Sequence, residues 1–247
     1  MHAGFIEHAS GGDLDPATAL RRAEAAAREA RHVGAAAPLP WHDELGARLL
    51  GDLELASAMQ RAVEQADFRL VFQPQVRMER GEPFGVEALI RWNDKARGMI
   101  MPSEFIPVAE ESQLIIPIGK WVIEEVCRQI QRWENAGMPS VQVALNLSAV
   151  QFRSAHLFED IAAILARADV LPGQIELEIT ESLLMDDPNA AVDLLARLRQ
   201  AGFSIAIDDF GTGYSSLSYL KKFPVGVLKI DRSFVKDLSD NMDDRAI

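Results

Sequence analysis

The sequence predicts an α/β fold in which helices cover a mainly parallel sheet. From Phe68 onward, short apolar runs alternate with segments of helical periodicity, a pattern typical of βαβ units. The apolar runs are nearly continuous, as in strands that are buried on both faces. The 247 residues fit one or two domains. A single α/β barrel can contain about 250 residues.

The first fifty residues differ from the rest of the chain. We expect a short strand over residues 2–9 and an alanine-rich helix over residues 19–34, with Asp15 as its N-cap. Residues 35–44 are interpreted as a linker because turn-forming prolines interrupt them. Apolar residues at helical spacing predict one helix over residues 44–65.

The remaining elements alternate along the chain. Strands are predicted over residues 68–76, 84–92, 141–149, 174–180, 203–210 and 225–231. Helices are predicted over residues 103–111, 114–137, 156–170, 189–202 and 214–223. Gly137 is expected as the C-cap of the helix over residues 114–137, and the helix over residues 189–202 is expected to end at Gly202.

Composition excludes several function classes. The formal net charge is −12, which argues against a protein that coats nucleic acid by neutralising phosphates. No apolar run approaches the roughly 18 residues of a membrane helix, and the N-terminus lacks the features of a signal peptide. The single cysteine, Cys127, excludes an internal disulfide framework and fits a reducing cytoplasm. The acidic balance leaves open a metal-dependent enzyme.

Polar residues gather at or near the C-terminal ends of five successive strands. They are Glu87, Asn146, Glu178, Asp208 with Asp209, and Lys229. In α/β barrels and open α/β sheets, this edge carries the chemistry. The carboxylates at such an edge repel each other unless cations neutralise them. The pattern therefore favours a metal site.

The chemistry of the candidate ligands limits which metal ions could bind. The candidate ligands are oxygen donors, which suit hard ions such as Mg²⁺ or Mn²⁺. Asp208 and Asp209 are adjacent, so one can bridge two ions while its neighbour binds the second. Two ions about 3.5–4 Å apart can clamp the attacking and leaving oxygens of a phosphodiester. Lys229 would then stabilise phosphate charge or orient the attacking water.

Each of these residues also has a purely structural interpretation. A single acidic residue at a strand end is commonly a helix N-cap or a turn former, and Glu181 precedes a helix-like run. Glu176 shares a strand face with Glu178 and would be a salt-bridge partner. Asn146 would be a turn residue and Lys229 a solvated surface residue.

A dinucleotide-binding loop is a second alternative. The segment GTGYSS, residues 211–216, follows a strand and resembles part of that fingerprint. Ser216 stands where the third glycine belongs, and Asp208 and Asp209 would repel a pyrophosphate. We therefore favour the metal site.

Seven segments occur in the order seen in one known family. They are VFQPQV, EALIRW, MPSEFIPVAEESQLI, VALNLSAVQF, LEITES, IDDFGTGYSSLSYL and LKIDRSFV. From about Phe68 to its end, the chain resembles EAL-domain proteins, bacterial phosphodiesterases that linearise cyclic di-GMP to pGpG. The resemblance implies an α/β fold of the modified (β/α)8 (TIM-like) barrel type with an antiparallel first strand. It also implies two Mg²⁺ or Mn²⁺ ions at the C-terminal edge of the barrel.

The resemblance further implies a set of metal ligands. Glu87, Asn146, Glu178 and Asp208 match ligands of the first ion. Asp208 would also bridge to the second ion, for which Asp209 matches a ligand. Glu87 and Asp209 would thereby be catalytic residues.

Other matching residues would act around the ions. Lys229 matches a catalytic lysine near the attacking water. Glu181 matches the residue that steadies the loop Phe210–Ser216, which supports metal binding and dimerisation. Gln73 and Arg91 match positions that touch the dinucleotide.

The resemblance divides the chain into three parts. Residues 1–40 resemble the C-terminal remnant of a degenerate GGDEF-like domain, residues 41–66 a linker and connecting helix, and residues 67–247 an EAL domain lacking its last two strands. One of those two strands carries a glutamate at the second ion. Six strands would leave two open sheet edges. We therefore expect the chain as given to aggregate or to bind substrate weakly, with little turnover.

Two functions remain open. The leading one is hydrolysis of cyclic di-GMP in bacterial signalling. The alternative is a catalytically degenerate EAL domain that senses cyclic di-GMP or interacts with proteins. In either case we expect a homodimer in the cytoplasm, with a GGDEF-type or sensory domain upstream that can also tether it to a membrane.

Overall fold

The structure is a computed structural model that describes residues 3–6, 15–32, 34–65, 67–211 and 220–236. The chain divides into two compact units, Met1–Ala58 and Met59–Ile247. Each unit is considered by itself. In the described ranges, no helix is long and apolar enough to cross a membrane.

The first unit combines a two-stranded parallel sheet with helices. Its elements are β1 (Gly4–Phe5), α1 (Pro16–His32), β2 (Leu39–Pro40) and the first part of α2 (Asp43–Gln65). The predicted N-cap of α1 is confirmed, because Asp15 Oδ1 accepts hydrogen bonds of 3.0 Å from the backbone amides of Ala17 and Thr18. Ala26 and Ala30 are fully buried, so alanine supplies much of this small core.

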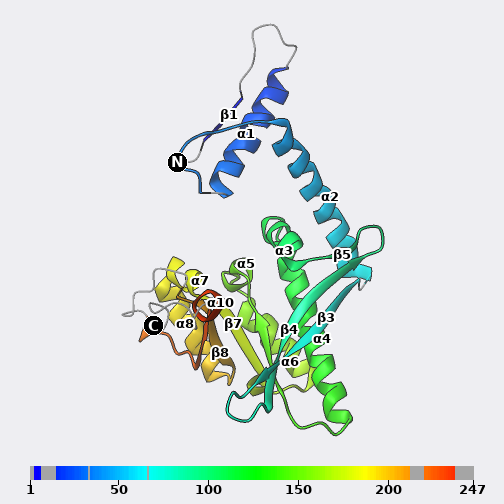
Figure 1. Ribbon diagram of the computed structural model, residues 1–247, viewed down its shortest axis with the longest axis vertical. Helices are drawn as coiled ribbons and strands as arrows, with labels where there is room; N and C mark the ends of the chain where they lie inside the picture. Colours follow the sequence, from blue (N-terminus) through cyan, green and yellow to red (C-terminus); the bar gives the residue numbers. More distant parts are fainter. Residues whose placement is uncertain (1–2, 7–14, 33, 66, 212–219, 237–247) are drawn as a thin grey trace. The chain divides into compact units, whose positions relative to one another are not determined.

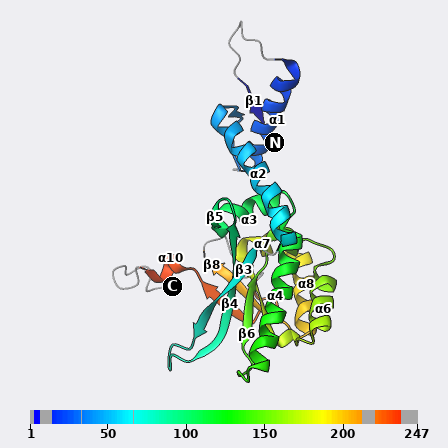
Figure 2. The same ribbon diagram turned by 90° about the vertical axis from the view of Figure 1, so that its right-hand side faces the viewer.

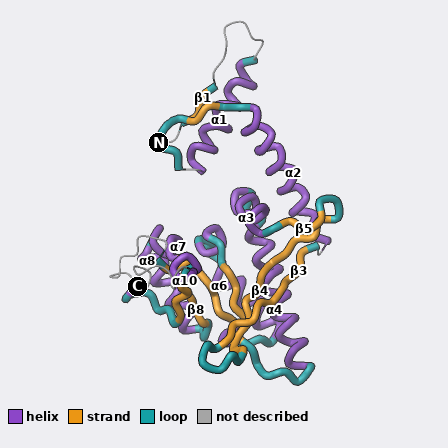
Figure 3. The backbone as a smooth tube through the Cα atoms, viewed as in Figure 1, coloured by secondary structure: helices purple, strands orange, loops and turns teal. Residues whose placement is uncertain are grey.

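The second unit is built on one sheet, whose strands are orange in Figure 3. The strands are β3 (Phe68–Val76), β4 (Pro83–Asp94), β5 (Gly98–Ile100), β6 (Gln142–Asn146), β7 (Ile175–Thr180), β8 (Ser204–Phe210) and β9 (Val227–Ile230). They lie in the order β3-β4-β6-β7-β8-β9, with β5 also paired to β4. β3 and β5 run antiparallel to β4, and the remaining pairs are parallel.

Helices follow most of these strands, as the alternation predicts. They are α3 (Pro102–Glu111), α4 (Ile115–Asn135), α5 (Ala149–Phe152), α6 (Leu157–Ala168), the 3₁₀ helix Pro172–Gln174, α7 (Glu181–Asp186), α8 (Pro188–Gln200) and α10 (Arg232–Lys236). α4, α6 and α8 lie side by side along one face of the sheet (Figures 1 and 2). Gly137 and Gly202, just after α4 and α8, have φ of 75° and 101°, the left-handed conformation that ends helices.

The two faces of the sheet differ in chemistry because side chains alternate along each strand. The face toward α4, α6 and α8 is apolar, and its buried residues include Leu145, Leu177 and Ile207. Asn146, Glu178 and Asp208 each come one residue later on the same strands. They therefore lie on the opposite face of the sheet. On that face Asn146 of β6 is the register partner of Glu178 of β7.

Several short elements, β5 and α5 among them, are not among the strands and helices predicted from the sequence. β5 forms after a tight turn, in which Asp94 Oδ1 accepts hydrogen bonds of 2.9 Å from Ala96 N and 2.8 Å from Arg97 N. α5 is a single turn that begins with a capping box of Ser148 and Gln151. Elements this short have no measurable hydrophobic period.

The expected barrel is not closed. Among the described strands, β3 and β9 stand at the two ends of the sheet and do not pair with each other, whereas a closed barrel of this type has about eight strands. The helix predicted over residues 214–223 falls largely on residues 212–219, which lie outside the described residues. The strand predicted over residues 2–9 is described only over residues 3–6, and that part contains β1.

Gly119 in α4 allows a buried glutamine to approach the helix. A Cβ at Gly119 would lie 1.9 Å from Gln151 Nε2, and the capping box with Ser148 holds Gln151 in place. We predict that Gly119→Ala lowers the free energy of unfolding by about 1–3 kcal/mol, although alanine favours helices. Gly173→Ala is the control, because its Cβ would meet nothing closer than Gly202 O at 3.8 Å. Urea denaturation compares the two variants, and equal stabilities would contradict the packing argument.

Candidate functional site

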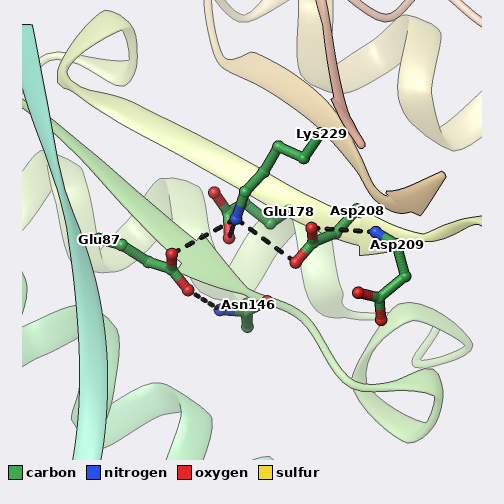
Figure 4. A network of polar contacts seen from close by, with 6 residues as sticks. All are labelled: Glu87, Asn146, Glu178, Asp208, Asp209 and Lys229. Atoms are coloured by element: carbon green, nitrogen blue, oxygen red, sulfur yellow. Dashed lines mark hydrogen bonds and ion pairs between the residues drawn. The ribbon is translucent and has the colours of Figure 1, made fainter. Parts of the chain in front are cut away.

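Six polar side chains from five strands lie close together at one edge of the sheet (Figure 4). They are Glu87 of β4, Asn146 of β6, Glu178 of β7, Asp208 and Asp209 of β8, and Lys229 of β9. All six are candidates from the sequence, and the structure brings them together. Parallel pairing explains this for β6, β7, β8 and β9, because the carboxyl ends of successive strands meet at the same edge. Glu87 does not lie at the end of its strand, as the sequence suggested, because β4 continues to Asp94; it lies near the end of the part of β4 that pairs with β6.

The ammonium group of Lys229 is the centre of the group. Its Nζ lies 2.7 Å from Glu178 Oε2 and 3.4 Å from both Glu87 Oε2 and Asp208 Oδ2. Three carboxylates on three different strands therefore converge on one atom (Figure 4). We call this arrangement of Lys229, Glu87, Glu178 and Asp208 the lysine–carboxylate cluster.

Asn146 and Asp209 extend the cluster. Asn146 Nδ2 donates a hydrogen bond of 2.8 Å to Glu87 Oε1, which orients that carboxylate. The backbone amide of Asp209 donates a hydrogen bond of 3.0 Å to Asp208 Oδ1. The Asp209 carboxylate points away from the Lys229 ammonium in Figure 4.

Burial shifts the pKa values of the side chains at the cluster. The Glu178 side chain is fully buried, and this loss of hydration raises its pKa to about 7, although the adjacent Lys229 ammonium opposes the rise. Burial by itself lowers the pKa of Lys229. Contact with Glu178 and the charges of Asp208 and Glu87 outweigh burial, so the pKa of Lys229 lies above its ordinary value. Burial, followed by the Asp208 charge, raises the pKa of Asp209.

The donor chemistry fits a hard divalent cation. Carboxylate and amide oxygens are the ligands that Mg²⁺ and Mn²⁺ prefer. Both oxygens of the buried Glu178 carboxylate lack a partner in hydrogen-bonding geometry, although Oε2 is close enough to Lys229 Nζ for an ion pair. As the side chains stand, no group of three His, Cys, Asp or Glu residues in the described chain is arranged to hold an ion.

Glu181 ties the loop after β8 to α7. It is the first residue of α7 and is 2% exposed. Its Oε2 accepts a hydrogen bond of 2.9 Å from the backbone amide of Gly211. Most of the loop Phe210–Ser216 that it is expected to steady lies outside the described residues.

Of the two residues expected to touch a dinucleotide, Gln73 lies beside the cluster, and Arg91 lines a cavity that Asn146 also borders. Gln73 of β3 is exposed and pairs in register with Glu87. Arg91 of β4 donates a hydrogen bond of 2.8 Å to Ile90 O. Together with Asn146, Arg91 lines a cavity of about 310 Å³ against α3 and α4. A larger cavity of about 700 Å³, beside α7 and α8, contains none of the candidate site residues.

Sequence reasoning missed Gln151, which helps to form the turn directly after Asn146. Ser148 Oγ accepts a hydrogen bond of 3.2 Å from Gln151 N, and Gln151 Oε1 accepts one of 3.2 Å from Ser148 N. The signal was present, because a serine followed three residues later by glutamine is the signature of a capping box.

Glu176, which shares a strand with Glu178, is 5% exposed, and burial raises its pKa.

The backbone of Asp209 generates a stability prediction. Its φ of 52° is left-handed, a conformation that Gly, Asn and Asp adopt more easily than β-branched residues. Asp209→Asn should therefore unfold at nearly the wild-type temperature without added metal, whereas Asp209→Val should lose about 1–2 kcal/mol. Thermal denaturation in EDTA measures both variants. A valine variant as stable as the asparagine variant would show that this backbone is not strained.

Comparison with known proteins supports one family. The model of the EAL domain matches residues 56–247. The bifunctional diguanylate cyclase/cyclic di-GMP phosphodiesterase MucR of Pseudomonas aeruginosa is 40% identical over 225 residues, which cover 91% of this chain and 33% of MucR. The cyclic di-GMP phosphodiesterase PdeR of Escherichia coli is 36% identical over 232 residues, which cover 94% of this chain and 34% of PdeR. The chain thus spans about a third of the length of these curated relatives.

A solved structure agrees with the sequence comparison. The structure of the PaMucR phosphodiesterase in complex with c-di-GMP has a TM-score of 0.74 and 43% sequence identity, over 78% of each chain. The similarity therefore extends from sequence to fold. With the family model matching residues 56–247, the chain belongs to the EAL-domain family.

Proposed function

We propose that the EAL domain of this protein hydrolyses cyclic di-GMP to linear pGpG. The phosphodiesterases MucR and PdeR, and the MucR complex with this dinucleotide, support the choice of substrate. The observation that carries the proposal is the convergence of Glu87, Glu178 and Asp208 on one point, with Asn146 hydrogen-bonded to Glu87. Unrelated turn and capping residues would not converge in this way.

Five of these side chains would hold two divalent ions, Mg²⁺ or Mn²⁺. Glu87, Asn146, Glu178 and Asp208 would hold the first ion, and Asp208 and Asp209 the second. When bound, such ions supply positive charge to the reacting oxygens of a phosphodiester. The hydrogen bonds from Asn146 to Glu87 and from the Asp209 amide to Asp208 hold two of these carboxylates in defined orientations.

The surrounding residues would bind and position the substrate. Gln73, opposite Glu87 in register, and Arg91, at the cavity that Asn146 also lines, would contact the dinucleotide. Lys229 would carry positive charge toward the reacting phosphate and help to orient the attacking water. Glu181, through its bond to the Gly211 amide, would hold the loop that supports metal binding and dimerisation.

The proposal extends to the setting of the domain. Residues 1–40 would be the remnant of a degenerate GGDEF-like domain, residues 41–66 a connection, and residues 67–247 the EAL domain. The name of MucR, which combines a diguanylate cyclase with a phosphodiesterase, supports such a pairing. The domain would act as a homodimer in the bacterial cytoplasm.

Loss of a proposed ligand should abolish catalysis. We predict that, in the complete EAL domain, Glu87→Ala and Asp208→Asn each lower hydrolysis at saturating Mn²⁺ by about a hundredfold or more, because each removes a carboxylate that would hold an ion. Chromatography of released pGpG measures the rate.

The matched control is Glu159→Gln, which removes a surface carboxylate paired with Arg197 and should leave the rate unchanged. Wild-type turnover in Glu87→Ala would reject its assignment. A wild-type protein that binds cyclic di-GMP without releasing pGpG would identify a sensor instead.

Metal size should separate binding from cleavage. Ca²⁺ accepts oxygen ligands at about 2.3–2.6 Å, whereas Mg²⁺ demands about 2.0–2.1 Å. We predict that Ca²⁺ supports binding of cyclic di-GMP, measured by calorimetry, but not release of pGpG. Equal turnover with Ca²⁺ and Mg²⁺ would show that the spacing of the two ions does not limit the reaction.

A further inference from the structure

We infer that Lys229 is the built-in counter-cation of this site, and that its ammonium must leave the cluster before a divalent cation can occupy it. The inference deepens the proposed function, on which it rests for the identity of the site. It assigns to Lys229 a role in the metal-free protein that is separate from any contact with substrate. Lys229 would thereby set the cation concentration at which the site fills.

The position of Lys229 Nζ is the first support. It lies 2.7 Å from Glu178 Oε2 and 3.4 Å from Glu87 Oε2 and Asp208 Oδ2. These are the same carboxylates that would hold the first ion. The ammonium therefore occupies the point at which their charges converge, and a cation cannot share that point with it.

The size of the cluster is the second support. A Mg²⁺ ion at the position of Nζ would lie 2.7–3.4 Å from the nearest carboxylate oxygens, beyond the roughly 2.0–2.1 Å that it requires. The oxygens are thus spaced for hydrogen bonds to an ammonium group. Filling the site with Mg²⁺ requires the ammonium to leave and the carboxylates to approach one another.

Burial explains why a resident charge is needed. The Glu178 side chain is fully buried, whereas those of Glu87 and Asp208 are 20% and 21% exposed. Mutual repulsion of carboxylates in such surroundings is screened little by water. A positive group that belongs to the chain neutralises part of this charge when no metal is bound.

Lys229 also has a route out of the cluster. Its side chain is 25% exposed, so part of it already lies outside the packed interior. A long flexible side chain at such a position can move its ammonium away from the point where the carboxylates converge without unpacking the apolar core.

Calorimetric titration of the protein with Mn²⁺ and Mg²⁺ tests the inference. Lys229→Met removes the competing charge, so its dissociation constant for Mn²⁺ should fall by about tenfold or more. Lys229→Arg keeps the charge and should bind no more tightly than wild type. Lys120→Met, which removes an exposed lysine paired with Asp160, is the matched control and should bind as wild type does.

A spectroscopic measurement covers the case in which Lys229→Met fails to fold. Wild-type protein labelled with ¹³C at the lysine ε-carbon is titrated with Mg²⁺, and the Lys229 signal is assigned by its loss in Lys229→Arg. That signal should shift with the same midpoint as the calorimetric titration. The signals of Lys95 and Lys120 should stay in place.

The possible outcomes separate this inference from the proposed function. The inference is overturned if the Lys229→Met variant binds Mn²⁺ no more tightly than wild type. It is also overturned if the Lys229 signal stays in place while Mg²⁺ binds. A site that binds no divalent cation in wild type or in Lys229→Met overturns it as well. Competition between Lys229 and Mn²⁺ in a protein that releases no pGpG supports the inference and overturns only the proposed function.

Discussion

Repulsion among carboxylates at one edge of a sheet is the constraint on which this structure depends. Glu87, Glu178 and Asp208 come from three strands and approach one point, where a single ammonium group faces them. Glu178 is fully buried, so water cannot screen its charge. A positive group beside the three carboxylates stabilises this arrangement in the folded chain. In the metal-free protein that group is Lys229.

The alternation of strand side chains makes this concentration of charge possible. On β6, β7 and β8, the residue directly before Asn146, Glu178 and Asp208 is an apolar core residue that packs toward the helices. The core therefore holds the strands in a register that also aligns the polar side chains on the other face. The same strand register therefore determines both the packing of the core and the position of the site residues. A shift of one residue in register would place the polar side chains on the core face and the apolar side chains on the site face.

The sequence predicts the members of the site better than their contacts. The placement of Asn146, Glu178 and Asp208 follows from strand ends and alternation, which are local properties that can be seen in the sequence. The position of Lys229 Nζ depends on how far one side chain reaches across neighbouring strands, which no local pattern encodes. The contact of Gln151 with Gly119 likewise joins residues far apart in the chain.

Helices and strands, too, are predicted well where they depend on a local pattern and poorly where they depend on individual contacts. Long elements such as β3 and α4 agree with their predicted positions, because their hydrophobic patterns extend over many residues. β5 and α5 depend on single hydrogen-bonded turns made by Asp94 and by Ser148 with Gln151. Such turns are visible in the sequence only when their side chains are considered one by one.

Anomalous diffraction from crystals of the protein soaked in Mn²⁺ tests the central claim most directly, because it locates the ion and the lysine in one experiment. The account predicts an anomalous peak between Glu87, Glu178 and Asp208, with Lys229 Nζ moved away from the position that it occupies without metal. A peak at another place, or Nζ still in contact with Glu178 Oε2 beside a bound ion, would contradict it.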